Sequence, residues 1–319
     1  MNLNTGTRSG RRLFRTLATF LLALPFAAPA LADSVDLSPG DRVVLLGATF
    51  VEREVRYGCI ETLLSAYFQE PDVSFRNLAW SGDTVFGDAR AGFDTAKEGY
   101  ERLLKHVDDA DPTIILVSYG QNESFNGNDG LDEFEAGMNR LLDDLAKNQA
   151  RIILVSPTLH ENLGPPLPDP GEHNEDIRRY TKAIGAIAKK RDHYFVDMTA
   201  LLPVTTGIAR GPRTDDGMHF TESGYWDVAA ALLKGLGHGA PPPDLERLAP
   251  LRETIIEKNR LFFNVWRAQN DTYIFGFRKY EQGGHAAEIP LFLPFIAEQE
   301  KKIAALRGEL RGEKGLNAQ

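Results

Sequence analysis

The stretch Thr113-Ile114-Ile115-Leu116-Val117-Ser118 is a continuous apolar run, and the turn residues Gly120-Gln121-Asn122 follow it. A short apolar run that is rich in β-branched residues and bounded by turn residues is typical of a strand buried on both faces of a sheet. Other stretches of the chain have the same character. The sequence therefore predicts buried strands at 42–46, 73–78, 113–118, 151–155 and 194–197.

Helical patterns separate these predicted strands. Apolar residues spaced as one face of a helix occur at 60–68, 131–145 and 174–190. Strands that alternate with amphipathic helices predict an α/β fold, with a parallel sheet covered by helices on both faces. Right-handed crossovers would then place the carboxyl ends of all strands at one edge of the sheet, where open α/β sheets bind their ligands.

The first 32 residues have the features of a secretory signal peptide. A basic segment with four arginines precedes an apolar run at 16–28, and Ala30-Leu31-Ala32 supplies a small-x-small cleavage site. The run is too short to span a bilayer, although a retained membrane anchor is the alternative. We expect export to the periplasm or the medium after cleavage near Ala32, and Arg11-Arg12 also permits the twin-arginine route.

Composition and charge exclude several classes of protein. The chain has 319 residues and a net charge of −9, and removal of the signal peptide with its four arginines leaves −13. Such a charge argues against a nucleic-acid-binding protein, which needs a basic surface. No later apolar run is long enough to span a membrane. The sequence does not specify an oligomeric state.

The single cysteine, Cys59, rules out an intramolecular disulfide. It lies within an apolar helical pattern, so we predict a buried structural thiol rather than a nucleophile. No spacing of cysteine and histidine residues indicates a zinc site, and we expect neither a metal nor a cofactor.

A long proline-rich segment at 157–173 follows the strand predicted at 151–155. It should therefore lie over the same edge of the sheet, where a segment of this length is usually a lid or a binding loop. The segment contains His160 and His173. We predict that both are plain surface histidines, and a contact with substrate is the alternative.

The stretch His238-Gly239-Ala240-Pro241-Pro242-Pro243 is a stiff linker at which the α/β pattern ends. We divide the chain into a signal peptide at 1–32, an α/β domain at 33–238 and a C-terminal extension at 239–319. The extension is predicted to hold helices at 245–268 and 294–311, with an aromatic stretch between them. We expect its aromatic residues to pack on the α/β domain or on their own hairpin. The alternative is that four residues of the extension contact the active edge or a partner, namely Trp266, Arg267, Asn270 and Arg278.

A carboxylate and an imidazole lie three positions apart in Asp216-Gly217-Met218-His219, and Thr221 behind them is a suitable N-cap for the next helix. A histidine placed in this way can act as a general base that the acid holds in one tautomer. The alternative is a loop that merely contains two polar residues.

Four polar blocks occur in a fixed order along the chain. They are Gly47-Ala48-Thr49, Asn77-Leu78-Ala79-Trp80-Ser81-Gly82-Asp83-Thr84, Gly120-Gln121-Asn122-Glu123 and Asp216-Gly217-Met218-His219. Together they resemble the sequence blocks of the SGNH (GDSL-like) hydrolases, over roughly residues 40–236. The resemblance implies a three-layer α/β/α sandwich of flavodoxin-like arrangement, to which this chain adds a helical C-terminal extension.

The resemblance also implies roles for individual residues. Gly82 matches the glycine whose backbone N–H joins the oxyanion hole, and Asn122 matches the asparagine whose amide is another donor. His219 matches the general base and Asp216 its orienting acid. Fixed N–H donors are suited to this task because acyl transfer develops negative charge on a carbonyl oxygen.

The first block departs from the family pattern, because Thr49 stands where the family has its nucleophilic serine and Ala48 replaces the preceding aspartate. Three interpretations stay open: Thr49 is the nucleophile, the site is catalytically inactive, or another hydroxyl such as that of Ser81 has taken over. Glu52 and Arg53 follow on an early helical turn. We expect them on a solvated face, and the alternative is that they point towards the active edge.

Two segments, 46–53 and 258–263, are similar to a branch of exported SGNH-like proteins with threonine at this position and an added C-terminal tail. We therefore predict a secreted ester hydrolase with Thr49, His219 and Asp216 as catalytic residues and Gly82 and Asn122 in the oxyanion hole. The expected substrate is a small acyl ester, with an acetyl group on a carbohydrate as one such substrate. The alternative is an inactive SGNH-like protein that binds a glycan or a protein partner.

Overall fold

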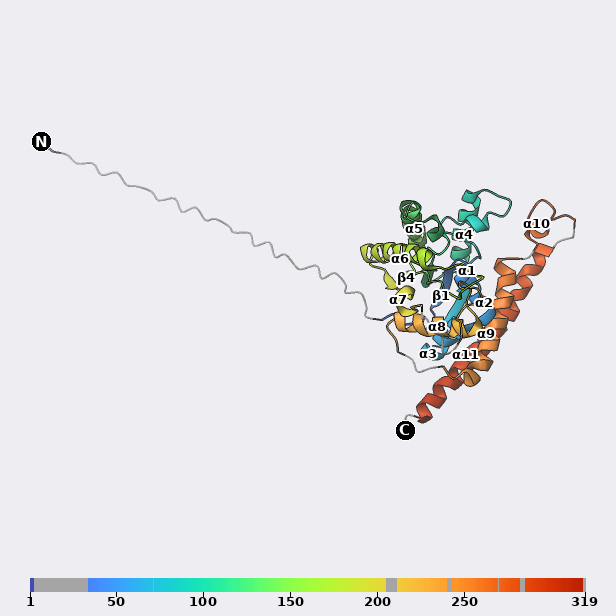
Figure 1. Ribbon diagram of the computed structural model, residues 1–319. Coiled ribbons are helices and arrows are strands. Elements are labelled where there is room, and N and C mark those ends of the chain that lie inside the picture. Colours follow the sequence, from blue (N-terminus) through green and yellow to red (C-terminus); the bar gives the residue numbers. More distant parts are fainter. Residues whose placement is uncertain are drawn as a thin grey trace. The chain divides into compact units, whose positions relative to one another are not determined.

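Five parallel strands form one sheet in the order β2-β1-β3-β4-β5 in a computed structural model of the protein (Figure 1). The structure describes residues 1–2, 34–70, 72–204, 211–239, 243–268, 270–281 and 285–317. The predicted signal peptide, apart from residues 1–2, and residues 240–242 of the predicted linker lie outside this part of the chain.

The strands are β1 (Arg42–Gly47), β2 (Ser74–Asn77), β3 (Ile114–Ser118), β4 (Arg151–Val155) and β5 (Tyr194–Val196). All five predicted strands are therefore confirmed, with small shifts at their ends. β1 pairs with β2 on one side and with β3 on the other. The strand order consequently reverses at β1, and the crevice outside the carboxyl end of that strand is where a ligand site is expected in such sheets.

Helices cover both faces of the sheet. They are α1 (Thr49–Glu52), α2 (Glu54–Tyr57), α3 (Cys59–Phe68), α4 (Ala96–Asp109), α5 (Leu131–Leu145), α6 (Gly171–Arg191), α7 (Met198–Leu201) and α8 (Glu222–Gly235), with short 3₁₀ turns η1 (Asp88–Arg90), η2 (Glu123–Asn126) and η3 (Ala146–Asn148). Val44 and Leu46 of β1 pack in a core with α4, α5 and α6. Val43 and Leu45 face the other core, which includes α3 and α8. Because side chains alternate along a strand, each strand contributes to both cores, and the predicted three-layer α/β/α fold is confirmed.

Two long helices form most of the C-terminal extension, α9 (Leu245–Trp266) and α11 (Leu293–Asn317), and they lie side by side in Figure 1. Between them come α10 (Asp271–Ile274) and η4 (His285–Phe292). Leu251 and Ile255 of α9 and Ile303 of α11 are buried in the same core as α3. The buried ammonium of Lys258 lies 2.8 Å from the Glu61 carboxylate of α3. The extension is therefore packed on the α/β layers by apolar and charged contacts.

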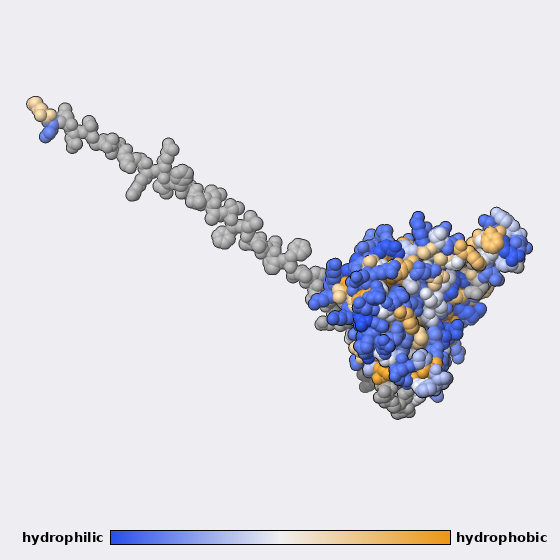
Figure 2. All heavy atoms as spheres, turned by 45° about the horizontal axis from the view of Figure 1, so that its top comes forward, coloured by the Kyte–Doolittle hydropathy of each residue, from blue (hydrophilic) through white to orange (hydrophobic). Residues whose placement is uncertain are grey.

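The aromatic residues of the extension behave in two ways. Phe262 and Trp266 pack against the core, as expected. Phe277 and Tyr280 are 80% and 86% exposed, so the expectation that the aromatic stretch packs on the domain or on its own hairpin is wrong for these two residues. The face drawn in Figure 2 is largely hydrophilic, with hydrophobic patches scattered over it.

Cys59 begins α3 and is fully buried, as predicted. Burial is the main cause that raises the pKa of its thiol, and the Glu54 carboxylate raises it further. No helix in the described part of the chain is both long enough and apolar enough to cross a membrane.

Candidate active site

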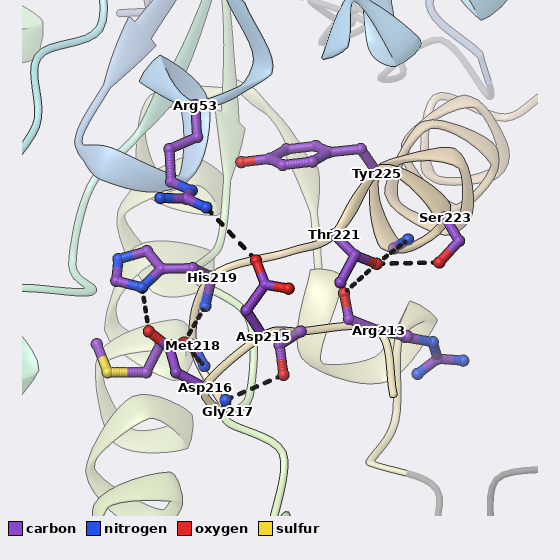
Figure 3. Close-up of polar contacts among 12 residues, drawn as sticks. Arg53, Arg213, Asp215, Asp216, Gly217, Met218, His219, Thr221, Ser223 and Tyr225 are labelled. Carbon is purple, nitrogen blue, oxygen red and sulfur yellow. Dashed lines mark hydrogen bonds and ion pairs between the residues drawn. The ribbon is translucent and has the colours of Figure 1, made fainter. Parts of the chain in front are cut away.

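His219 is fixed by the carboxylate of Asp216 in the loop before α8 (Figure 3). Asp216 Oδ2 lies 2.6 Å from His219 Nδ1, and Oδ1 accepts hydrogen bonds from the backbone N–H groups of Met218 and His219 at 3.0 and 2.9 Å. The side chain of Thr221 caps α8 by accepting from the Gly224 N–H. The loop therefore holds the imidazole by its Nδ1 and leaves Nε2 as the atom that can take a proton.

The Asp216 carboxyl is ionised at neutral pH. Partial burial raises its pKa, but the hydrogen bonds from the His219 ring and from the backbone N–H groups of His219 and Met218 outweigh burial and lower the pKa to about 2. An ionised acid at Nδ1 favours the tautomer with the proton on that nitrogen. It also stabilises the imidazolium that forms when Nε2 accepts a proton.

Thr49 and Gly82 meet at the carboxyl ends of β1 and β2. Thr49 is the first residue of α1, directly after β1, and its Oγ1 accepts a hydrogen bond of 3.0 Å from the Gly82 backbone N–H. Gly82 has a φ of 76°, in the left-handed region that favours glycine. The predicted nucleophile and one predicted oxyanion donor therefore lie together at the point where the strand order reverses.

Asn122 lies after β3 and joins the same loop. Its Nδ2 donates a hydrogen bond of 2.7 Å to the Asp83 carbonyl oxygen, next to Gly82. Within the described residues, no hydrogen bond joins Thr49 to His219. Catalytic hydrogen bonds are often long in an empty site and tighten when substrate binds. The structure thus brings Thr49, Gly82 and Asn122 to one edge and presents His219 on a separate loop.

That loop is tied to α1 by ionic and aromatic contacts. Arg53 lies 3.7 Å from the Asp215 carboxylate (Figure 3), and the ring centroids of Phe50 and Phe220 are 5.7 Å apart. The Tyr225 hydroxyl of α8 donates to the Phe50 carbonyl oxygen at 2.6 Å. Since Thr49 begins α1, these contacts fix the loop that carries His219 relative to Thr49.

The expectation of a solvated face for Glu52 and Arg53 is wrong. Their side chains are only 15% and 20% exposed. Glu52 Oε2 accepts a hydrogen bond of 2.6 Å from the Ser81 hydroxyl. Both side chains point towards the active edge because α1 is a single turn that starts at the carboxyl end of β1.

A buried ion pair supports the loop that carries Gly82. Asp83 Oδ2 accepts from Arg90 Nε at 2.7 Å and from the Tyr119 hydroxyl at 3.0 Å, and Arg90 also donates to the Leu78 carbonyl oxygen. Burial raises the pKa of Asp83, while Arg90 opposes the rise. Breaking such a pair would leave a charge buried and unpaired, so the loop is held firmly from inside.

Glu161 is a residue that sequence reasoning missed. It lies in the proline-rich segment after β4, and its Oε2 accepts from the Thr214 N–H at 2.8 Å and from the Thr214 hydroxyl at 2.5 Å. Its own N–H donates to the Gly217 carbonyl oxygen at 2.8 Å. A Cβ on Gly217 would come within 2.8 Å of the Glu161 carbonyl oxygen, so only glycine fits there. The length of this segment was the only signal in the sequence.

The same segment carries His160, and the expectation of a surface histidine is wrong, because it is only 6% exposed. Burial, assisted by the nearby His173, lowers its pKa to about 4. Its ring contacts the side chain of Gln121. His173 is half-buried and stacks on Phe125, whose ring centroid lies 4.0 Å away and whose side chain is 59% exposed. An aromatic surface therefore lies on η2, beside Asn122.

The sequence model of the GDSL-like lipase/acylhydrolase family matches residues 51–226, which is more than half of the chain. The chain belongs to the GDSL-like lipase/acylhydrolase family. The match includes Gly82, Asn122, Asp216 and His219, and it begins two residues after Thr49. This GDSL-like protein is therefore a member of a family of ester hydrolases.

Solved structures resemble the GDSL-like chain in fold. A variant of an acetyl-xylooligosaccharide esterase from Geobacillus stearothermophilus is 19% identical, and the match covers 64% of this chain and 97% of that one with a TM-score of 0.50. An acetyl xylan esterase is 18% identical, with coverage of 60% and 98% and a TM-score of 0.46. A gut microbial diltiazem-metabolizing enzyme is also 18% identical, with coverage of 64% and 48% and a TM-score of 0.47. No curated protein sequence matches the chain. The likeness concerns the fold alone.

Among the residues that the structure describes, no group of three or more histidine, cysteine, aspartate or glutamate side chains could hold a metal ion. What the GDSL-like site offers is a hydroxyl, an imidazole oriented by a carboxylate, a backbone N–H and a side-chain amide. These groups suit nucleophilic attack on a carbonyl carbon and stabilisation of the resulting oxyanion.

Proposed function

We propose that this GDSL-like protein hydrolyses ester bonds with Thr49 as nucleophile and His219 as general base. The observation that carries the proposal is the 3.0 Å hydrogen bond between the Gly82 N–H and Thr49 Oγ1, and a histidine held by an ionised acid on a separate loop supplies the base. Acyl transfer needs a nucleophile and an oxyanion donor that lie close enough to act on the same carbonyl group. Residues 1–32 support the further proposal that the chain is exported to the periplasm or the medium.

In the proposed mechanism the Thr49 hydroxyl attacks the ester carbonyl carbon while His219 Nε2 takes its proton. The carbonyl oxygen becomes an oxyanion, which accepts hydrogen bonds from the Gly82 N–H, the Asn122 amide and the Thr49 N–H. His219 then protonates the departing alcohol, which leaves an acyl-threonine. A water molecule that gives its proton to His219 cleaves this ester, and Thr49 regains its proton. Asp216 keeps the imidazole oriented throughout.

Threonine changes the requirements of the first step. Its methyl group restricts rotation about χ1 and crowds the approach to the carbonyl carbon. A small acyl group such as acetyl suits a crowded nucleophile. The fold likeness to an acetyl-xylooligosaccharide esterase and the exposed Phe125 ring support an acetylated carbohydrate as substrate, since a flat ring can pack against one face of a sugar.

The second candidate is a binding protein without turnover. The observation that favours it is that no hydrogen bond joins Thr49 to His219 within the described part of the chain. In this case the same edge would bind a glycan or a protein partner, and a change at His219 would alter affinity alone.

The deciding experiment is hydrolysis of p-nitrophenyl acetate by the purified protein and by Thr49→Ala, Thr49→Ser, His219→Ala and Ser81→Ala. We expect turnover by wild type and Thr49→Ser, a loss of about 10³-fold or more in Thr49→Ala and His219→Ala, and retention of most activity in Ser81→Ala. Melting temperatures would show that each variant is folded.

Other outcomes would identify the alternatives. Loss of activity in Ser81→Ala with retention in Thr49→Ala would make Ser81 the nucleophile. An inert wild type together with an active Thr49→Ser would show that the base and the oxyanion donors are competent and that the threonine prevents turnover. Binding would then be the better account of the site.

A further inference from the structure

The end of α9 reaches the loop that carries the proposed oxyanion donor. We call residues 80–83 the oxyanion loop. Trp266 is the last residue of α9 and Arg267 its C-cap, whose N–H donates to the Phe263 carbonyl oxygen at 2.9 Å. Both side chains contact Trp80, the first residue of the oxyanion loop. A segment far along the chain therefore contacts the loop that carries the proposed oxyanion donor.

Arg267 contacts the loop in two ways. Its guanidinium carbon lies 3.7 Å from the centroid of the Trp80 ring, and Nη1 lies 3.7 Å from Glu52 Oε1. The other oxygen of Glu52 accepts from the Ser81 hydroxyl, which directly precedes Gly82. Arg267 and Glu52 are only 22% and 15% exposed. A chain of contacts thus runs from the extension through Glu52 to the residue before the oxyanion donor.

Trp266 completes the support from a second side. Its ring meets Trp80 edge-on with centroids 5.8 Å apart, and the buried guanidinium of Arg90 lies 5.6 Å from the Trp80 ring and 5.9 Å from the Trp266 ring. Arg90 in turn holds Asp83, the last residue of the oxyanion loop. Both ends of the loop are therefore joined to α9.

We propose that Trp266 and Arg267 are positioning residues, which hold the oxyanion loop where the Gly82 N–H faces Thr49. The inference rests on the proposed hydrolase function and assigns part of it to the C-terminal extension. Neither residue touches the reacting atoms. A shift of about 1 Å in a backbone donor is enough to slow a reaction by about 10²-fold, so support at this distance matters for turnover.

Attachment of α9 does not depend on these two residues. Lys258 pairs with Glu61 in the core, and Arg252 donates to the Tyr57 carbonyl oxygen at 2.6 Å. Removing the Arg267 side chain should therefore release the oxyanion loop without detaching the helix. Because other residues attach α9, a loss of loop position can be told apart from a loss of overall stability.

The test compares wild type with Arg267→Ala, Arg267→Lys and Arg260→Ala. Arg260 is the matched control, because it lies on the same helix, is exposed and, among the residues that the structure describes, pairs only with Glu257 one turn away. For each protein, kcat and KM on p-nitrophenyl acetate, the melting temperature and hydrogen exchange at the Trp80, Gly82 and Asp83 amides would be measured.

In Arg267→Ala we expect kcat to fall about 10- to 100-fold while KM changes less than about threefold. Exchange at the oxyanion-loop amides should accelerate about tenfold or more, with a melting temperature close to that of wild type. Arg267→Lys keeps the positive charge but loses the planar guanidinium that stacks on Trp80. Its kcat and its exchange rates should therefore lie between those of wild type and Arg267→Ala. Arg260→Ala should match wild type.

Unchanged kcat and unchanged exchange in Arg267→Ala would overturn the inference, and so would faster exchange with full activity. An equal effect in Arg260→Ala would show a general loss of stability instead and would also overturn it. If wild type proves inert, the proposed function fails by itself. Exchange at the oxyanion loop then still decides whether Arg267 holds it, with unchanged exchange counting against the inference.

Discussion

Asp216 accepts three hydrogen bonds from two neighbouring residues, and together they constrain His219. Two come from backbone N–H groups and one from the imidazole. A carboxylate bound in this way has few other orientations available, so the ring it holds is pre-organised for proton transfer. The i to i+3 spacing of acid and base is sufficient to build this arrangement within one turn.

Asp216→Asn should lower kcat by about 10²- to 10⁴-fold, because an amide can donate to Nδ1 and so stabilise the wrong tautomer. The measurement is the rate of p-nitrophenyl acetate hydrolysis across neutral pH. Asp109→Asn is the control, since its carboxylate is 59% exposed and pairs with Lys105 one turn away on α4. An exposed pair of this kind contributes little, so the control should stay within about threefold of wild type. Equal loss in both variants would contradict the assigned role of Asp216.

Local spacing explains which site residues can be found from sequence. Asp216 and His219 lie in one turn, and Thr49, Gly82 and Asn122 each follow a strand, so a sequence pattern can reveal them. Their geometry is now described, while their roles stay predictions. By contrast, Glu161 contacts Thr214 across 53 positions, and Arg267, which the sequence named only as an alternative contact of the active edge, reaches Glu52 across 215 positions. Contacts of that range depend on how the elements pack, which no local pattern encodes.

The proline-rich segment after β4 supports the loop that carries His219. Glu161 provides three hydrogen bonds to the backbone and side chain around Thr214. Glu161→Gln replaces one accepting oxygen with a donor, and we expect kcat to fall about tenfold as the loop loosens. Glu172→Gln, on the exposed first turn of α6, is the control. Hydrogen exchange at residues 214–219 should accelerate in the first variant only. An unchanged rate in Glu161→Gln would contradict this supporting role.

At the level of elements, the five strands are predictable because burial on both faces demands continuous apolar runs. The burial of Glu52 and His160 was not predictable for a different reason. Both belong to polar segments whose exposure is decided by neighbouring residues, the C-cap of α9 for Glu52 and Phe125 of η2 for His160. The long helices of the extension can be predicted from the spacing of their apolar residues. The residues of the α/β layers that α9 contacts cannot be predicted in this way.

The buried pair between Lys258 and Glu61 ties α9 to α3. Lys258→Met would leave the Glu61 carboxylate buried without its cation, and we expect the free energy of unfolding to fall by about 3–5 kcal/mol. Urea denaturation measures this change. Lys302→Met is the control, because that lysine pairs with Glu298 on the surface and should change stability by less than about 1 kcal/mol.

Removing both charges should recover much of the loss. In the double variant Glu61→Gln with Lys258→Met, both charges of the pair are removed, so unfolding should require more free energy than in Lys258→Met alone. A double variant as unstable as the single one would indicate that the contacts of Lys258 with its other neighbours, such as the Phe75 carbonyl oxygen, matter more than the ion pair.

For the whole molecule, four buried or partly buried histidines should make stability depend on pH. Burial is the main cause that lowers the pKa of four histidines, namely His106, His160, His173 and His193. For His106 and His160 the pKa is about 4, against about 6.5 when unfolded. Between these two values the unfolded chain binds more protons than the folded one. The histidines should therefore lower the free energy of unfolding as the pH drops from about 6.5 towards about 4, and the buried Glu54, Asp83 and Glu123, whose pKa is raised by burial, act in the opposite direction.

Urea denaturation at pH 7 and at pH 4.5 would measure this loss in wild type and in His160→Gln. His160 alone should account for up to about 3 kcal/mol of the difference, because its ring is almost fully buried. The difference between the two pH values should shrink in His160→Gln. His285→Gln, at an exposed histidine of η4 that contacts Glu288, serves as control and should keep the wild-type difference. Identical pH dependence in all three proteins would contradict the assignment to His160.

The burial of Cys59 also makes the molecule convenient to label. A fully buried thiol with a raised pKa forms little thiolate and is out of reach of maleimide reagents. A cysteine introduced at an open position, such as Phe277 at 80% exposure, would then be the one that reacts. Fluorescent or spin labels can thus be attached to the extension without first removing the native cysteine, so that ligand-dependent movement can be followed in the otherwise unaltered chain.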